Sequence, residues 1–192
     1  MDRSILLDVL HSLQLLFVGY TPAAAFGLLI GLIIGINRFS YQICKRLLLV
    51  PHSITPIAFL PLALILIKQA EPASIFVVFI GSLWTVLIKT SEAVQKFRQN
   101  DNLRIAFREI FDALRIGIWI AWMTVIATEI ITGAKGIGFL LWDAYNNRNT
   151  INLVQSIFYI GIIGFLIDQL LELTAFIVSS VLPEQKKTSI DR

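Results

Sequence analysis

Charged residues are scarce in this chain of 192 residues, of which only 15% are charged while 56% are hydrophobic. Soluble domains carry about 25% charged residues and a smaller apolar fraction. The mean hydropathy of +0.76 is likewise high for a soluble domain. Composition therefore argues against a soluble enzyme and predicts an integral membrane protein.

Cysteine and histidine are nearly absent too. The single cysteine, Cys44, cannot form a disulfide within one chain, and we interpret it as a packing residue. The two histidines, His11 and His52, show no ligand spacing with each other or with the acidic residues. An intramembrane enzyme would need a paired nucleophile and base, which the sequence does not mark. We therefore predict no catalytic residue, no metal and no cofactor in this chain.

Basic residues slightly outnumber acidic ones, with 16 lysines and arginines against 13 aspartates and glutamates. They stand in short clusters between apolar runs, so they indicate membrane topology rather than a nucleic-acid partner. The first residues lack the basic start, clean apolar core and cleavage site of a signal peptide. Insertion is therefore expected to depend on the first spanning helix.

Five stretches have the roughly 20 largely apolar residues that a helix needs to cross the hydrocarbon core of a bilayer. They run approximately over residues 13–36, 47–67, 73–88, 113–132 and 151–178. Alanine and glycine in the first stretch allow close helix packing. Pro51, Pro56 and Pro61 should kink or break the second one near its start, as in many helices that line a pathway. The predicted fold is an all-α membrane protein with about five transmembrane helices.

Lysine and arginine in the short connections predict the orientation. The side expected to face the cytoplasm holds most of them, namely Arg38, Lys45, Arg46, Lys96, Arg98, Arg104, Arg108, Lys186, Lys187 and Arg192. The predicted regions are an N-terminal segment (1–12), a transmembrane domain (13–182) and a cytoplasmic tail (183–192). An odd number of spans with an inner C-terminus puts the N-terminus outside, so we expect a further helix before the first.

The connection over residues 133–150 has three glycines before a short amphipathic stretch, and it is too short and polar to span the bilayer. We expect a re-entrant or surface half-helix near residues 136–147, on the outer side. The glycines lack the Gly-Lys-Ser/Thr ending of a phosphate-binding loop, so nucleotide binding is not predicted.

Three carboxylates lie in or beside apolar stretches, where an ionisable group is unfavourable unless it faces a cavity or a partner. Glu129 has two open interpretations, a pathway or gate residue, or a carboxylate that reaches the interface or bonds to Thr132 or the glycine loop. Asp168 and Glu172 stand four residues apart on one helix face. Proton relay or glycosidic chemistry would use such a pair. We interpret the pair instead as marking the cytoplasmic membrane boundary.

Four stretches have the residues and the order of one known membrane-protein family. They cover residues 19–38, 51–61, 80–90 and 114–146. The most specific is the last, with Thr-Glu-Ile-Ile-Thr-Gly followed by Gly-Ile-Gly-Phe-Leu-Leu-Trp-Asp-Ala-Tyr-Asn. The chain resembles the permease subunits of ABC importers, in the nitrate, bicarbonate, cyanate and sulfonate branch, over about residues 13–180. The family begins with a further spanning helix, which agrees with the predicted topology.

The resemblance implies a type I importer permease that moves a small inorganic anion across a bacterial, for example cyanobacterial, inner membrane. It implies a transport subunit rather than an enzyme, since a separate ABC ATPase would hydrolyse ATP. The other implied partners are a substrate-binding protein or lipoprotein, a second permease subunit in a homodimer, and the lipid bilayer. Selectivity among nitrate, bicarbonate and cyanate is expected to lie in the binding protein.

Two groups of residues are candidates for this mechanism. The translocation pathway or its gate would use Ser82, Thr85, Thr124, Thr128 and Glu129. The loop that couples to the ATPase would use Arg98, Arg104, Phe107, Arg108 and Glu109. This loop, within residues 92–112, is about half the expected length and lacks the Glu-Ala-Ala then Gly signature of the family. An amphipathic helix that docks on an ATPase and one that lies on anionic lipid are both open interpretations.

The shortened loop also supports an alternative function from another class. A diverged permease-like protein that no longer couples to ATP would act as a membrane scaffold or regulatory subunit. The family mechanism needs a rigid contact between this loop and the ATPase, because closure of the ATPase subunits moves the membrane halves through it. Whether the loop contacts an ATPase therefore distinguishes a working importer from a scaffold.

Overall fold

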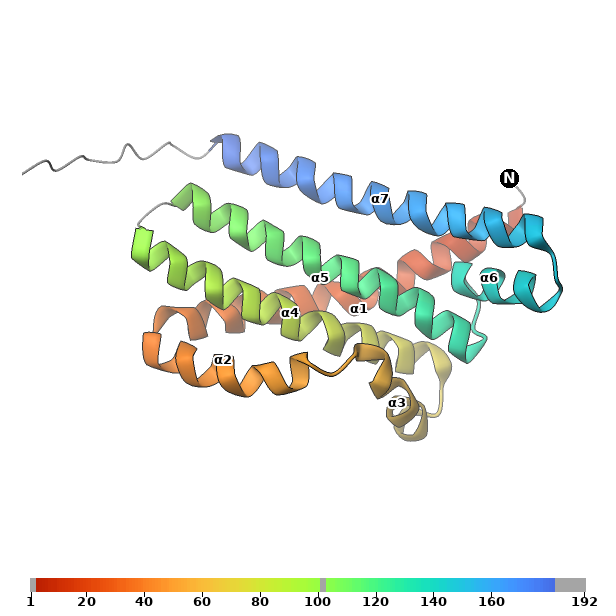
Figure 1. Cartoon of the computed structure of the whole chain (residues 1–192), viewed down its shortest axis with the longest axis horizontal. Coiled ribbons are helices and arrows are strands. Elements are labelled where there is room, and N and C mark those ends of the chain that lie inside the picture. Colours follow the sequence, from red (N-terminus) through yellow and green to blue (C-terminus); the bar gives the residue numbers. More distant parts are fainter. Residues whose placement is uncertain (1–2, 101–102, 182–192) are drawn as a thin grey trace, which may run out of the picture.

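The computed structural model describes residues 3–100 and 103–181, and this part of the chain forms a bundle of helices without strands (Figure 1). The elements are α1 (Arg3–Ile36), α2 (Arg38–His52), the 3-10 helix η1 (Pro56–Phe59), α3 (Leu60–Ile67), α4 (Ala70–Asn100), α5 (Leu103–Thr132), α6 (Ile137–Asn146) and α7 (Thr150–Val181). The predicted all-α class is confirmed. The predicted tail over residues 183–192, with its three basic residues, lies outside the described residues.

Four helices are long and apolar enough to cross a membrane, namely α1, α4, α5 and α7. The second predicted span, over residues 47–67, is not one continuous helix. It is divided between the end of α2, a short turn, η1 and α3. In Figure 1, α2 runs back along the bundle, and α3 projects from the bundle beyond it. Proline lacks a backbone N–H and is favoured in a first helical turn, and Pro56 and Pro61 occupy such positions in η1 and α3. The expected break is therefore confirmed, and its position lies after His52.

The helices α1 and α4 pack closely along their length because glycines of α1 face α4. A Cβ atom on Gly27 would lie 2.9 Å from the Cβ of Val86. One on Gly31 would lie 2.7 Å from the carbonyl oxygen of Leu87. Such contacts leave no room for a larger residue, as at many helix interfaces in membranes. The close packing expected from the small residues of the first span is confirmed.

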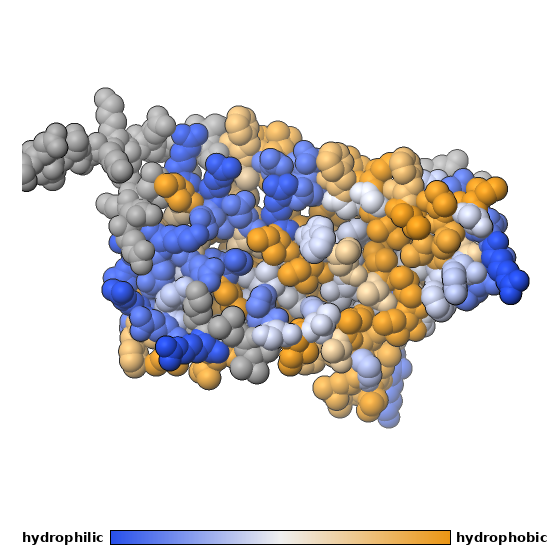
Figure 2. Space-filling view, viewed as in Figure 1, coloured by the Kyte–Doolittle hydropathy of each residue, from blue (hydrophilic) through white to orange (hydrophobic). Residues whose placement is uncertain are grey.

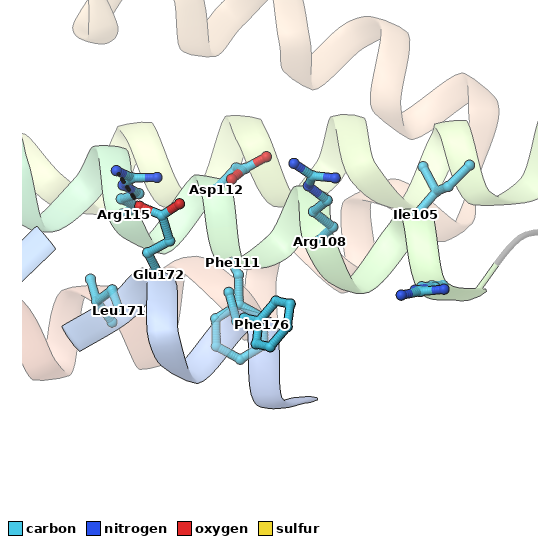
Figure 3. Close-up of a pocket in the computed structure, with 10 residues that line it drawn as sticks. Ile105, Arg108, Phe111, Asp112, Arg115, Leu171, Glu172 and Phe176 are labelled. Carbon is cyan, nitrogen blue, oxygen red and sulfur yellow. Dashed lines mark ion pairs between the residues drawn. The ribbon is translucent and has the colours of Figure 1, made fainter. Parts of the chain in front are cut away.

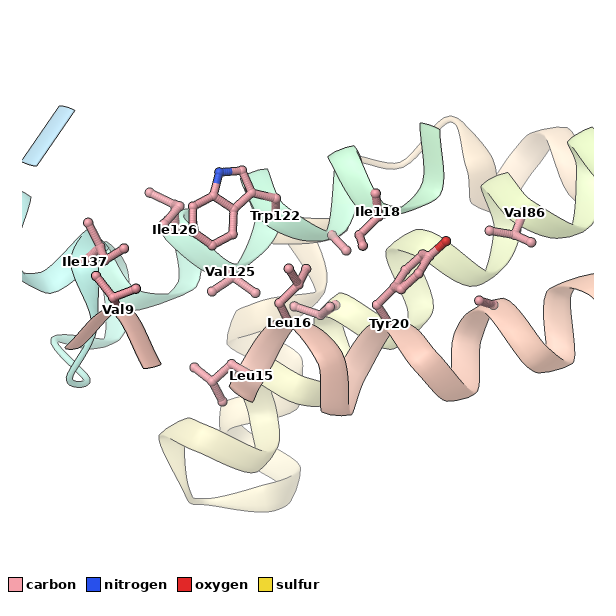
Figure 4. Close-up of a cluster of buried hydrophobic side chains, with 13 residues drawn as sticks. Val9, Leu15, Leu16, Tyr20, Val86, Ile118, Trp122, Val125, Ile126 and Ile137 are labelled. Carbon is pink, nitrogen blue, oxygen red and sulfur yellow. The ribbon is translucent and has the colours of Figure 1, made fainter. Parts of the chain in front are cut away.

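A buried apolar cluster joins α1 to α5 and α6 (Figure 4). In this cluster Leu16 of α1 lies beside Trp122 and Val125 of α5. Tyr20 of α1 lies between Ile118 of α5 and Val86 of α4. The Tyr20 hydroxyl, which would be unfavourable in an apolar core without a partner, donates a 2.7 Å hydrogen bond to the carbonyl oxygen of Leu114. The cluster packs the C-terminal half of α5 against α1.

The surface is divided between apolar and hydrophilic regions (Figure 2). Hydrophilic side chains gather at the end of the bundle where α1 and α4 end and α5 begins, and apolar ones cover much of the remaining face. Arg38, Arg98, Arg104 and Arg108, which the sequence assigns to the cytoplasmic side, all lie at this end. Helix α7 is the most uncovered of the long helices, since only 6% of its most apolar window is buried.

Candidate functional site

Glu129 is completely buried where α1, α5 and α6 meet. Its Oε1 accepts a 2.7 Å hydrogen bond from the Ser12 hydroxyl, and its Oε2 accepts a 2.8 Å bond from the backbone N–H of Gly138. The Ser12 oxygen also accepts a 3.0 Å bond from the backbone N–H of Ile137. Of the interpretations left open by the sequence, the structure shows the bond to the glycine loop.

The glycines of this loop are required by its geometry. Gly136 has a φ of 137°, which side chains rarely adopt, and a Cβ atom there would overlap the Glu129 carboxyl group. A Cβ atom on Gly138 would lie 2.5 Å from the carbonyl oxygen of Ile126. The loop therefore brings the N–H of Gly138 onto the carboxylate and the N–H of Ile137 onto the Ser12 oxygen. A donor at the start of a helix is a favourable partner for a carboxylate. The half-helix predicted near residues 136–147 is confirmed as α6.

The other pathway candidates are all buried and all bonded to their own helix. Their hydroxyl groups donate to backbone carbonyl oxygens, Ser82 to Val78, Thr85 to Gly81 at 3.4 Å, Thr124 to Ile120 at 2.7 Å, and Thr128 to Val125 at 2.8 Å. Such bonds satisfy a hydroxyl inside a membrane helix without a second helix. Thr85 also lines a hollow between α4 and the break after His52. The pathway role of these residues stays a prediction.

We call the second predicted span, over residues 47–67, the second pass. A hollow of about 120 Å³ lies at its break after His52, beside the middle of α4. Its lining residues are His52, Ile54, Pro56, Phe59, Ile80, Gly81, Trp84, Thr85 and Ile120. The Nε1 atom of Trp84 is buried and has no hydrogen-bond partner among the residues that the structure describes. Sequence analysis predicted a site role for neither Trp84 nor His52. The prolines of the second predicted span predicted the break in the helix. They did not predict which side chains line the hollow beside it.

The coupling candidates lie at the hydrophilic end of the bundle, where α4 ends and α5 begins. The Arg98 guanidinium donates to the carbonyl oxygen of Ile36 at the end of α1. Glu109 of α5 accepts hydrogen bonds of 2.7 and 2.8 Å from Lys96 of α4. Phe107 is 36% exposed on the first turns of α5. These turns are the expected amphipathic helix, and the partner that they contact stays a prediction.

A groove of about 360 Å³ runs between the start of α5 and the end of α7 (Figure 3). It is lined by Arg104, Ile105, Arg108, Phe111, Asp112, Arg115, Leu171, Glu172, Ala175 and Phe176. Arg115 forms a two-pronged ion pair with Asp168 and lies 3.1 Å from the Glu172 carboxylate. Sequence analysis missed this partner of the two acidic residues. Arg115 of α5 therefore pairs with both carboxylates of α7. These ion pairs act as a clamp that holds α7 on α5.

Comparison with known proteins agrees with this architecture. No family model matches the chain. The chain is 33% identical to the nitrate import permease protein NrtB of Synechocystis sp., over 97% of the chain and 73% of that protein. It is 32% identical to the NrtB of Leptolyngbya laminosa, over 97% of the chain and 72% of the relative.

A bicarbonate permease is similar to the same extent. The chain is 33% identical to the bicarbonate transport system permease protein CmpB of Synechococcus elongatus, over 88% of the chain and 68% of that protein. The resemblance found in the residues is therefore confirmed. With four apolar helices long enough to cross a membrane, this multi-pass protein of the bacterial inner membrane belongs to the ABC transporter permeases, in the nitrate and bicarbonate branch.

Proposed function

We propose that the chain is the membrane-spanning subunit of an ABC importer that moves a small inorganic anion, such as nitrate, bicarbonate or cyanate, into the cell. The observation that carries this proposal is the similarity to both nitrate and bicarbonate permeases over most of each chain. ATP hydrolysis belongs to separate ATPase subunits in this arrangement. A substrate-binding protein delivers the anion, and a second copy of the chain completes the pathway.

The buried carboxylate supports a gate at the outer end of the molecule. Glu129 repels an anion, so it acts through the hydrogen bonds that hold α6 rather than by binding the substrate. These bonds connect α6 to both α1 and α5. A movement of α1 relative to α5 therefore displaces the start of α6, which opens or closes the outer side.

The opposite end of the bundle supports contact with an ATPase. Ion pairing between Lys96 and Glu109 joins the ends of α4 and α5, and Arg98 joins α4 to the end of α1. These contacts make the end of the bundle a connected unit. Force applied to the exposed side chains of Phe107 and Arg108 is therefore passed to three long helices, which is what coupling to ATP hydrolysis requires.

Co-purification from mild detergent tests this function. The tagged protein is isolated from cells that contain its own genomic neighbours, and the bound proteins are identified by mass spectrometry. We expect an ABC ATPase at a one-to-one ratio with the permease. Variants Phe107→Ala and Arg108→Ala should reduce this recovery, whereas Trp142→Ala, an exposed change on α6, serves as the matched control.

The alternative function, an uncoupled membrane scaffold, predicts that no ATPase is recovered with the protein. The connection between α4 and α5 is short, because α4 ends at Asn100 and α5 begins at Leu103. Reproducible absence of an ATPase from folded, dimeric protein would contradict the importer and favour the uncoupled scaffold.

A further inference from the structure

We propose that the hollow at the break in the second pass is a transient binding site for the transported oxyanion, held by the indole N–H of Trp84, the hydroxyl of Thr85 and the imidazole of His52. This inference rests on the proposed transport of a small anion. It adds the place and the chemistry by which the anion is held inside the membrane.

The first argument is the unpaired donor. Buried indole N–H groups nearly always have a hydrogen-bond partner, and exceptions require an explanation. The Trp84 Nε1 atom is buried without a partner among the described residues, and the residue lines the hollow. A bound oxyanion would supply the missing acceptor.

The other donors beside Trp84 are also available to a ligand. The bond from the Thr85 hydroxyl to the Gly81 carbonyl oxygen is 3.4 Å long, which is longer than an ordinary bond of this type. The Thr85 hydroxyl can therefore turn toward a ligand with little loss of free energy. The imidazole of His52 has at least one N–H donor in every protonation state. Three neutral or weakly basic donors match the oxygens of a trigonal oxyanion.

The charge and size of the hollow also favour a small anion. None of the described residues that line it is acidic, in contrast to the groove between α5 and α7, which contains Asp112 and Glu172. Its volume of about 120 Å³ exceeds the roughly 30 Å³ that one water molecule occupies in the liquid. A single oxyanion with little of its water fits this space. The apolar remainder of the lining keeps binding weak, and a transport site must release what it binds.

The position in the fold supports the same assignment. Thr85 and Trp84 lie near the middle of α4, which places the hollow at half the depth of the bundle. Substrate sites of secondary transporters lie near the bilayer midplane, beside interrupted helices. The hollow has the same kind of position. Exposed Arg38 and Arg46 of α2 lie on the cytoplasmic side of the break and attract an anion onward.

The test uses conservative changes in the complete importer. Trp84→Phe removes the N–H but keeps an aromatic ring, and Thr85→Val removes the hydroxyl but keeps the shape. Thr85→Ser, which retains the hydroxyl, is the rescue variant. Trp119→Phe and Thr174→Val are matched controls, because both side chains are exposed on the outer faces of α5 and α7. Uptake of ¹⁵N-nitrate, ¹⁴C-bicarbonate and ¹⁴C-cyanate is measured in cells with equal amounts of folded importer.

We expect Trp84→Phe and Thr85→Val each to lower the maximal uptake rate about tenfold, since a hydrogen bond to a charged group contributes about that factor. The half-saturating concentration should stay the same, because the binding protein captures the anion. Thr85→Ser and the controls should transport like the wild type. If Thr85→Val fails to fold, Trp84→Phe decides the question alone.

Rates equal to those of the controls would overturn the site while leaving the importer intact. A wild-type importer that carries none of the three anions would overturn the proposed function together with the site. The two failures are therefore distinguishable in one set of measurements.

Discussion

Replacing Ser12 by alanine should destabilise the protein far more than the loss of one oxygen atom suggests. The Ser12 hydroxyl donates to Glu129 and accepts from the backbone N–H of Ile137, and all these groups are buried. Loss of a hydrogen bond to a charged group costs about 1.5–3 kcal/mol, and a buried unpaired N–H costs about 1–3 kcal/mol more. The sum, about 2.5–6 kcal/mol, is a large part of the stability of an ordinary domain.

Ser74→Ala is the matched control for this change. Ser74 is as buried as Ser12, with 1% exposure, but its hydroxyl donates only to the Ala70 carbonyl oxygen of its own helix, at 2.9 Å. The Ala70 oxygen already accepts a backbone hydrogen bond within α4. Loss of the Ser74 hydroxyl should therefore cost less than about 1 kcal/mol. The two variants therefore differ in what they leave unpaired rather than in burial.

Thermal unfolding of the purified protein in detergent measures the difference. For a chain of this size, where 1 kcal/mol shifts the Tm by about 2–4 °C, we expect the Tm of Ser12→Ala to fall by about 5–24 °C and that of Ser74→Ala by at most about 4 °C. In a double-mutant cycle, Ser12→Ala should cost less when Glu129 has already become leucine. Equal losses for the two serine variants, or additive effects in the cycle, would refute the reasoning about the buried carboxylate.

Three further changes test the packing of α6 and α7. Gly138→Ala should destabilise by about 1–3 kcal/mol because its Cβ meets backbone, whereas Gly161→Ala, with nothing within 4 Å, should leave the Tm at or slightly above the wild-type value. Asp168→Asn should weaken the clamp with Arg115 by about 1 kcal/mol or less, since both side chains are partly exposed, and high salt should reduce the difference from the wild type.

The helices themselves were largely predictable because their signals are local. Length and apolarity identified α1, α4, α5 and α7, and Pro56 and Pro61 identified the break, since a missing N–H acts within one turn. The glycines before α6 likewise predicted the start of a short helix. Each of these features depends on residues close together in the chain.

The contacts that define the candidate sites were not predictable from local pattern. Ser12 and Glu129 are 117 residues apart, and Arg115 and Asp168 are 53 residues apart. Which faces of two helices meet depends on the packing of the whole bundle, and a single sequence does not encode it in any spacing. Trp84 shows the same limit, because its unpaired N–H is a property of the space around it.

The uncovered state of α7 has a consequence for how the protein is made. Its contacts are mainly with α5 and α6, and little of its apolar surface is buried within the chain. The ribosome releases α1, α4 and α5 first, and these helices hold the buried clusters and the glycine contacts among themselves. We therefore expect α7 to dock after α1, α4 and α5 have packed, as a late and separable step of biogenesis.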